Sequence, residues 1–232
     1  MSQTEKFDRG LLRMGGIAAI LAGSLILFAF VVAESNGVMF FSSVYEGGSA
    51  EPWMKMVLAS PSLSQGIMVL PALGFSCMLL VMGVMRQVIE EGSWQKTLAT
   101  AGYGIGVPVA VIAFTLQLSL MNEVLLVGAR RPELSSSLEL VASVFLYAFH
   151  VVNHYVGPFL IIVMGTGMMA WAALRSAVLP RWLCIWLMTC AVMVFLSLLN
   201  PVVPVLGVLG FFAPLHMLGF IMLGVAVLRM GA

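Results

Sequence analysis

The fold is decided by the stretch from Leu138 to Arg175, which reads LELVASVFLYAFHVVNHYVGPFLIIVMGTGMMAWAALR. It is apolar for almost its whole length, yet it contains His150 and His154, two of the three histidines of the chain. About 20 apolar residues suffice to cross a bilayer, so the stretch predicts a membrane-spanning helix of unusual length. A proline inside a helix removes a backbone hydrogen bond and bends the helix. Because Pro158 lies in this stretch, we expect a kink beside the histidine pair.

The composition of the whole chain is typical of a membrane protein. Hydrophobic residues make up 61% of the 232 residues and charged residues 9%, whereas about 25% of the residues of a soluble domain are charged. This excludes an ordinary soluble domain and predicts a single all-α transmembrane domain over residues 1–232. The net charge is +1 and no long run of basic residues occurs, which excludes nucleic acid as a partner.

Six apolar segments predict a bundle of six transmembrane helices. The first segment could also be a signal peptide, but its apolar run is longer than the roughly 7 to 15 residues of a signal sequence. The outer loop that follows, residues 34–64, is expected to place a short amphipathic helix in the membrane interface. The predicted spans cover about residues 11–33, 65–86, 98–128, 138–175, 182–200 and 205–229.

Small residues mark the places where these helices are expected to touch, because they let two helix backbones approach closely. The third predicted span contains a GxxxG pattern formed by Gly102 and Gly106. The first predicted span carries four small residues, namely Gly15, Gly16, Ala19 and Gly23. We therefore expect close helix contacts on both spans.

The basic residues predict the orientation of the bundle. With six spans, eight of the eleven lysines and arginines fall on the side of the termini: Lys6, Arg9, Arg13, Arg86, Lys96, Arg175, Arg181 and Arg229. The opposite side receives Lys55, Arg130 and Arg131. Positive residues are enriched on the cytoplasmic side of a membrane, so both termini are expected to be cytoplasmic.

Polar residues gather near the predicted outer face. At a rise of about 1.5 Å per residue, His154 lies about 25 Å and His150 about 31 Å above Trp171, which marks the inner boundary of a core about 30 Å thick. Four residues apart, the two imidazoles share one helix face. An ionisable residue in a membrane span is a functional-site hypothesis. The predicted ligand pocket comprises Tyr147, His150, Asn153, His154, Asn200 and His216.

Three interpretations of this polar group remain open. In the first, His150, His154 and His216 bind a metal ion with Glu123 as a further ligand, since imidazoles at i and i+4 can reach one ion. In the second, one histidine on each of two helices ligates a haem. In the third, the polar groups only hydrogen-bond one another. His216 is about 20 Å above Arg229 and so lies about 11 Å deeper than His150, and no HExxH motif occurs.

The connection from Leu174 to Phe195, LRSAVLPRWLCIWLMTCAVMVF, resembles a segment of a large group of uncharacterised bacterial six-helix membrane proteins. In that group a glycine-bearing span ends in a basic residue and a serine, followed by Leu/Ile-Pro-Arg-Trp/Phe-Leu. The corresponding residues here are Arg175, Ser176, Leu179, Pro180, Arg181, Trp182 and Leu183. The resemblance implies a six-helix fold in the bacterial inner membrane over nearly the whole chain, and it implies no activity.

No sequence motif indicates a reaction. The chain contains no Walker loop, no dinucleotide-binding fingerprint and no GxSxG motif. The leading hypothesis is a non-enzymatic component of the cell membrane. It would bind a small apolar ligand or lipid in an outward-facing pocket, or serve as an accessory subunit with membrane-protein partners or further copies of itself. The alternative is a metal- or haem-dependent redox protein that uses the three histidines. A small transporter is a third hypothesis, which the lack of an internal repeat weakens.

Overall fold

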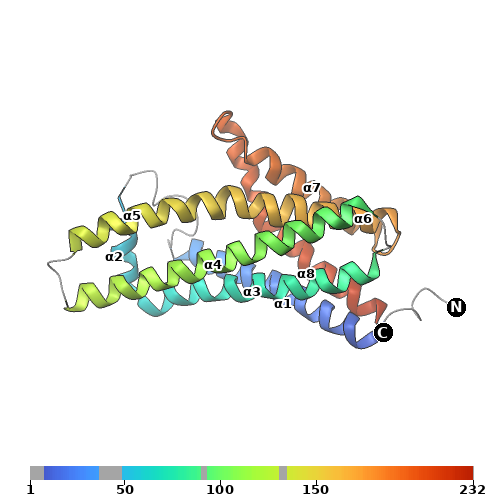
Figure 1. Cartoon of the computed structure of the whole chain (residues 1–232), viewed down its shortest axis with the longest axis horizontal. Helices are drawn as coiled ribbons and strands as arrows, with labels where there is room; N and C mark the ends of the chain where they lie inside the picture. The colour runs from blue at the N-terminus through green and yellow to red at the C-terminus, as the bar shows by residue number, and fades with distance from the viewer. Residues whose placement is uncertain (1–7, 37–48, 90–92, 131–134, 232) are drawn as a thin grey trace.

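The structure is a computed structural model that describes residues 8–36, 49–89, 93–130 and 135–231. These residues form helices of several kinds and no β-strand, as Figure 1 shows. Five helical segments are long and apolar enough to cross a membrane, which supports the predicted multi-pass membrane protein. They are α1 (Arg9–Ser35), α3 (Pro61–Val88), α4 (Trp94–Arg130), the run from α5 (Ser135–Val151) through α6 (Met168–Arg175), and the run from η5 (Pro204–Phe211) through α8 (Phe212–Met230).

Helix α1 lies between α3 and α8 and packs on both through its small residues. A Cβ added at Gly15 would lie 2.6 Å from Val84 of α3. One added at Gly23 would lie 2.5 Å from the carbonyl oxygen of Met217 in α8. The predicted small-residue face of the first span is therefore confirmed, and it serves two neighbours at once.

Glycines also bring α4 against the fourth predicted span. A Cβ at Gly102 would lie 2.5 Å from the carbonyl oxygen of Leu160 and 2.7 Å from the backbone nitrogen of Gly165. Tyr103 follows Gly102 in the chain, and Thr166 follows Gly165. The hydroxyl of Tyr103 and Oγ1 of Thr166 are 2.6 Å apart, and both residues are buried. The close contact predicted from the GxxxG pattern is confirmed, and a buried hydrogen bond accompanies it.

The fourth predicted span is helical from residue 135 to residue 175, through α5, η3 (Val152–Val156), η4 (Pro158–Gly167) and α6. Both η3 and η4 are π-helices. A π-helix bonds residue i to residue i+5, and the Gly157 N–H accordingly donates to the carbonyl of Val152. In place of a sharp kink at Pro158, the chain runs on as a gently arched rod (Figure 1). The wide π turns tolerate Pro158, which has no backbone N–H to donate.

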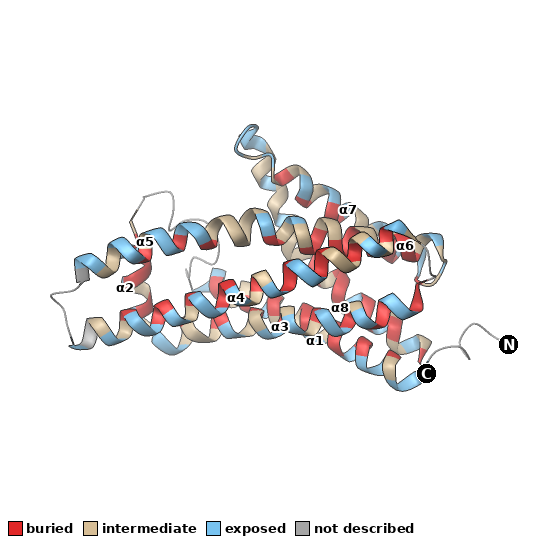
Figure 2. Cartoon of the chain, in the orientation of Figure 1, coloured by how far each residue is buried: buried red, intermediate tan, exposed pale blue. Residues whose placement is uncertain are grey.

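The fifth predicted span is the shortest. Helix α7 (Arg181–Ser197) has 17 residues, a length of about 25 Å at a rise of about 1.5 Å per residue. That is less than the hydrocarbon thickness of about 30 Å, so the count of six crossings stays a prediction. Helix α7 packs on η4, α6 and α8, and with η5 it forms a hairpin that diverges from α5 (Figure 1). The tip of this hairpin is exposed (Figure 2).

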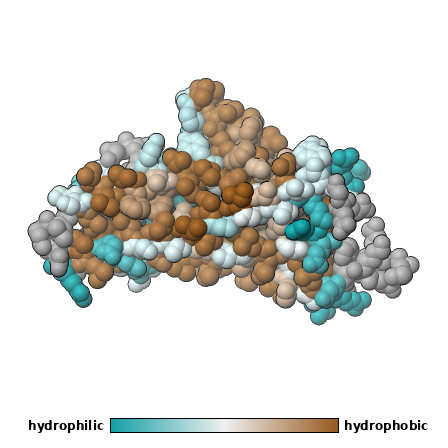
Figure 3. Space-filling view, viewed as in Figure 1, coloured by the Kyte–Doolittle hydropathy of each residue, from teal (hydrophilic) through white to brown (hydrophobic). Residues whose placement is uncertain are grey.

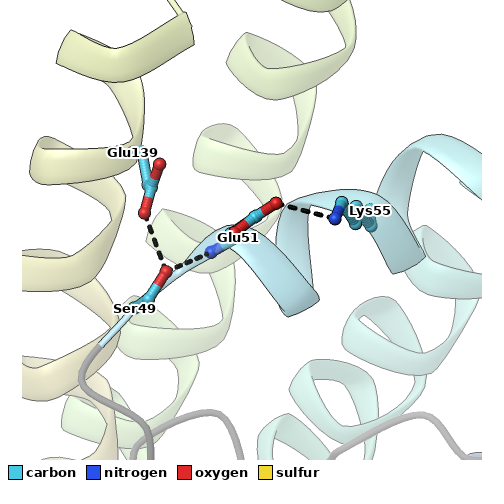
Figure 4. A network of polar contacts seen from close by, with 4 residues as sticks. All are labelled: Ser49, Glu51, Lys55 and Glu139. Carbon is cyan, nitrogen blue, oxygen red and sulfur yellow. Dashed lines mark hydrogen bonds and ion pairs between the residues drawn. The ribbon is translucent and has the colours of Figure 1, made fainter.

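A short helix follows the first span, as expected for the loop 34–64: α2 (Glu51–Ala59) buries Trp53 and Val57 against α3 and α4. The residues before α2 bind α5, as Figure 4 shows. Oγ of Ser49 donates to Glu139 at 2.7 Å, and the N–H of Ala50 donates to Oγ of Ser143 at 3.0 Å. Residues 37–48 of the predicted loop lie outside the described residues.

Helix α2 also carries an exposed ion pair. Nζ of Lys55 and Oε1 of Glu51 are 2.7 Å apart, with side chains 74% and 58% exposed. The hydrogen bond from Lys55 and its charge hold the pKa of Glu51 below its ordinary value. Exposed pairs of this kind add little to stability, so the buried Trp53 and the bonds to α5 hold α2 in place.

The start of α1 and the end of α8 meet at one end of the bundle. A Cβ at Gly231 would lie 3.1 Å from Cβ of Leu12 and 3.5 Å from the carbonyl oxygen of Arg9.

The rings of Trp94 and Trp171 are in edge-on contact, with centroids 5.4 Å apart. These indole rings are of the kind that anchors helices at a membrane interface.

The glycine contact predicts the effect of adding a side chain. Replacing Gly102 with valine drives the new carbons into the backbone of η4, whereas a Cβ at Gly104, two residues along the same helix, meets nothing within 4 Å. We expect Gly102→Val to destabilise the protein by about 1–3 kcal/mol or more and Gly104→Val to change its stability much less. Thermal unfolding of both variants in detergent measures the difference, and equal unfolding temperatures would show that the contact is not made.

Candidate functional site

The candidate site is the group of aromatic rings around His150 and His154. The two imidazoles are nearly parallel, with an interplanar angle of 13° and centroids 5.1 Å apart. Tyr155 meets both edge-on, with its centroid 5.9 Å from His150 and 4.9 Å from His154. All three side chains are half-buried, so part of each ring stays accessible.

The local backbone explains why three rings meet. His150 lies in the last turn of α5, and the other two residues lie in the π-helix η3. On an α-helix, residues i and i+4 share a face. Tyr155 directly follows His154 in η3, and its ring lies edge-on to both imidazoles. The sequence reveals the i, i+4 pair, but the part of Tyr155 depends on a π turn that hydrophobic periodicity does not predict.

The third histidine has different surroundings. His216 is fully buried in α8, and its ring meets Phe220 at a centroid distance of 5.1 Å. Neither Nδ1 nor Nε2 of His216 has a hydrogen-bond partner among the described residues. The indole N–H of Trp186 on α7 is also buried and has no hydrogen-bond partner among the described residues. This N–H lies beside Gly219, because a Cβ at Gly219 would be 3.2 Å from Trp186 Nε1.

The other residues of the predicted pocket, and the predicted metal ligand Glu123, lie on several elements. Asn153 is half-buried in η3, and Tyr147 is 57% exposed on α5. Asn200 follows α7 and lies against Gly207, where a Cβ would be 2.8 Å from its Oδ1. Glu123 is exposed on α4, and its neighbour Asn122 accepts a hydrogen bond of 2.7 Å from Gln65.

The structure therefore brings together only part of the predicted set. His150, Asn153 and His154 lie within two successive turns, and Tyr155 joins them. Within residues 8–36, 49–89, 93–130 and 135–231, no group of three or more His, Cys, Asp or Glu side chains could hold a metal ion. The predicted set of His150, His154, His216 and Glu123 does not form such a group in this part of the chain.

Comparison of the chain with protein-family models, with curated protein sequences and with solved structures gives no match. The resemblance of residues 174–195 to the six-helix group stays a prediction. The function must therefore be inferred from the site itself.

The unpartnered imidazole of His216 predicts a gain in stability when it is removed. A buried polar group without a partner costs about 1–3 kcal/mol, and leucine is an apolar side chain of similar size. We expect His216→Leu to unfold at a higher temperature than the wild type in detergent. His216→Ala, which removes the polar group but leaves a cavity, is the control and should be less stable than His216→Leu. A large loss of stability in His216→Leu would show that the imidazole has a partner in the membrane.

Proposed function

We propose that this protein is a non-enzymatic, multi-pass component of the bacterial inner membrane that binds a phospholipid at His150, His154 and Tyr155. The bundle crosses the bilayer six times, with both termini in the cytoplasm and the histidine pair near the outer face. The single observation that carries the proposal is the half-buried group of one phenol and two stacked imidazoles in an otherwise apolar helix.

The depth of the group supports a lipid headgroup as the ligand. Counted from Trp171, the two histidines lie roughly 20 to 30 Å up the rod, allowing for π turns that are flatter than α turns. A hydrocarbon core of about 30 Å ends near this level, where the ester and phosphate oxygens of the outer leaflet begin. Imidazole and phenol both donate hydrogen bonds, and bonds to a charged phosphate are the stronger kind.

The shape of the bundle supports the placement of an acyl chain. Helix α7 packs on η4, and the hairpin then diverges from η3 and α5 toward the outer end (Figure 1). Exposed apolar side chains lie on both arms, with Phe159 on η4 and Phe195 on α7. Figure 3 shows the hairpin standing out from the body as an apolar projection. Inside a bilayer, hydrocarbon chains fill the space between two diverging helices, and a chain held there leads up to the histidine pair.

The orientation predicts the result of a reporter experiment. Because the ends of α1 and α8 meet and most basic residues belong to that side, a reporter active only in the cytoplasm should be active when fused after residue 232. The matched fusion after residue 130, at the opposite end of α4, should be inactive. Activity of an extracytoplasmic reporter at the C-terminus would contradict the proposed topology.

Lipid retention tests the proposed ligand. Native mass spectrometry of the protein released from mild detergent should show a phospholipid adduct on the wild type. The double variant His150→Ala/His154→Ala should lose about a hundredfold or more in lipid affinity, because each of the two hydrogen bonds to a charged group contributes about 1.5–3 kcal/mol and about 1.4 kcal/mol corresponds to a factor of ten.

The control is the double variant Leu79→Ala/Leu80→Ala, which changes two exposed apolar residues of α3 and leaves the histidines intact. It should keep the adduct at the wild-type level. A wild-type protein that carries no lipid, or equal lipid loads in all three proteins, would refute the proposed function.

A further inference from the structure

The end of the bundle at which α1 begins and α8 ends carries an exposed arginine without a carboxylate partner. Arg175 is the last residue of α6, and it forms no ion pair in the described part of the chain. Its guanidinium offers several N–H donors in a planar fork. Figure 3 shows hydrophilic side chains gathered at this end of the molecule. Within the described residues, the charge of Arg175 is therefore not neutralised.

A buried glutamine holds this arginine in place. Gln95 lies in the first turn of α4 and is only 1% exposed, and its amide is oriented by its hydrogen-bond partners. The carbonyl oxygen of this amide accepts from Nη1 of Arg175 at 3.2 Å and from Nε1 of Trp94 at 3.3 Å. Its nitrogen donates to Oγ of Ser93 at 2.9 Å. A neutral amide thus fixes the position of the guanidinium without cancelling its charge.

The boundaries of the apolar segments put this arginine at the surface of the membrane. Of the two segments that meet here, one begins at Trp94 and the other ends at Arg175, and α4 packs on α6. Trp94 is 53% exposed, and its ring meets that of Trp171 edge-on. Indole rings favour the headgroup level of a bilayer. The guanidinium is therefore expected at the level of the lipid phosphates.

We infer that Arg175, positioned by Gln95 and flanked by Trp94, binds the phosphate of an anionic phospholipid in the leaflet at this end of the bundle. Guanidinium and phosphate form short, charge-assisted bonds that are frequently bidentate. Basic pockets between transmembrane helices bind anionic headgroups in this way. Net charge sets the preference. Lys96, next to Gln95 in the chain, adds a second cation, whose Nζ donates to the carbonyl of Ile89 at 2.9 Å. A zwitterionic headgroup brings an ammonium group that these cations repel.

Lipid titration tests the site. Native mass spectrometry of the wild type should show tighter binding of phosphatidylglycerol, which is anionic, than of phosphatidylcholine, which has no net charge. Arg175→Gln should bind phosphatidylglycerol about tenfold or more weakly, because bonds to a charged group are lost, and its affinity for phosphatidylcholine should change much less. The variant still folds, because Arg175 is exposed. Arg175→Lys, which keeps the charge but lacks the fork, should be intermediate.

Two further variants separate a built site from general attraction to a basic surface. Arg86→Gln is the matched control, because Arg86 is an exposed arginine in the last turn of α3, and it should keep the preference for phosphatidylglycerol. Gln95→Glu replaces the amide with a carboxylate of nearly the same size. This carboxylate pairs with Arg175 and neutralises it, so the preference should disappear although the arginine is still present.

Equal losses in Arg175→Gln and Arg86→Gln, or a wild type without a preference for the anionic lipid, would overturn the inference. Displacement of the lipid by millimolar inorganic phosphate would assign the arginine to a free anion, and an adduct only with an acidic protein would assign it to a protein partner. Either result also overturns it. His150→Ala/His154→Ala should lose its own adduct but keep this preference, so failure of this site and failure of the proposed function can be told apart.

Discussion

The hydrocarbon core offers the backbone no hydrogen bonds, and the rest of the structure depends on this constraint. Every N–H and C=O at that depth must bond within the protein, so the fourth span cannot break at Pro158 without exposing carbonyls to lipid. It continues as two π-helical segments instead. His154 and Tyr155 lie in the first of these segments, and their rings contact that of His150 at the end of α5. The candidate site thus lies where the α-helical part of this span gives way to its π-helical part.

The same constraint distinguishes the buried polar groups from one another. Tyr103 and Thr166 bond to each other at the contact between α4 and η4, and the pair fixes the register of two helices that glycines allow to approach. His216 is equally buried and has no such bond within the described residues. A polar residue inside a span is therefore not by itself evidence of a site. The hydrogen-bond partner of that residue must also be identified. Where it has none, an opening that would admit a ligand must be found.

The sequence was most informative about the close contacts between helix backbones and about the lengths of the apolar helices. Gly15, Gly23 and Gly102 could be recognised as contact points because only glycine lets helices approach so closely, and the structure confirms these contacts. Helix rise gives the depth of a residue but not the direction in which its side chain points. For this reason the sequence could place His216 deeper than His150 but could not tell that its ring turns into the packed contact with Phe220. Tyr155 was missed because its place depends on a π turn.

The fourth predicted span changes its neighbours along its length, although its composition stays apolar. Its C-terminal part, through η4 and α6, packs on α4 and α7, and its N-terminal part, α5, packs on α4. A soluble helix would change to polar residues on its uncovered side. Leu140 and Val144 are apolar, although the bundle leaves both exposed. Covering each of these side chains with hydrocarbon or with protein gains about 1.5–3 kcal/mol relative to exposure to water, so the composition of this face suits a nonaqueous neighbour of either kind.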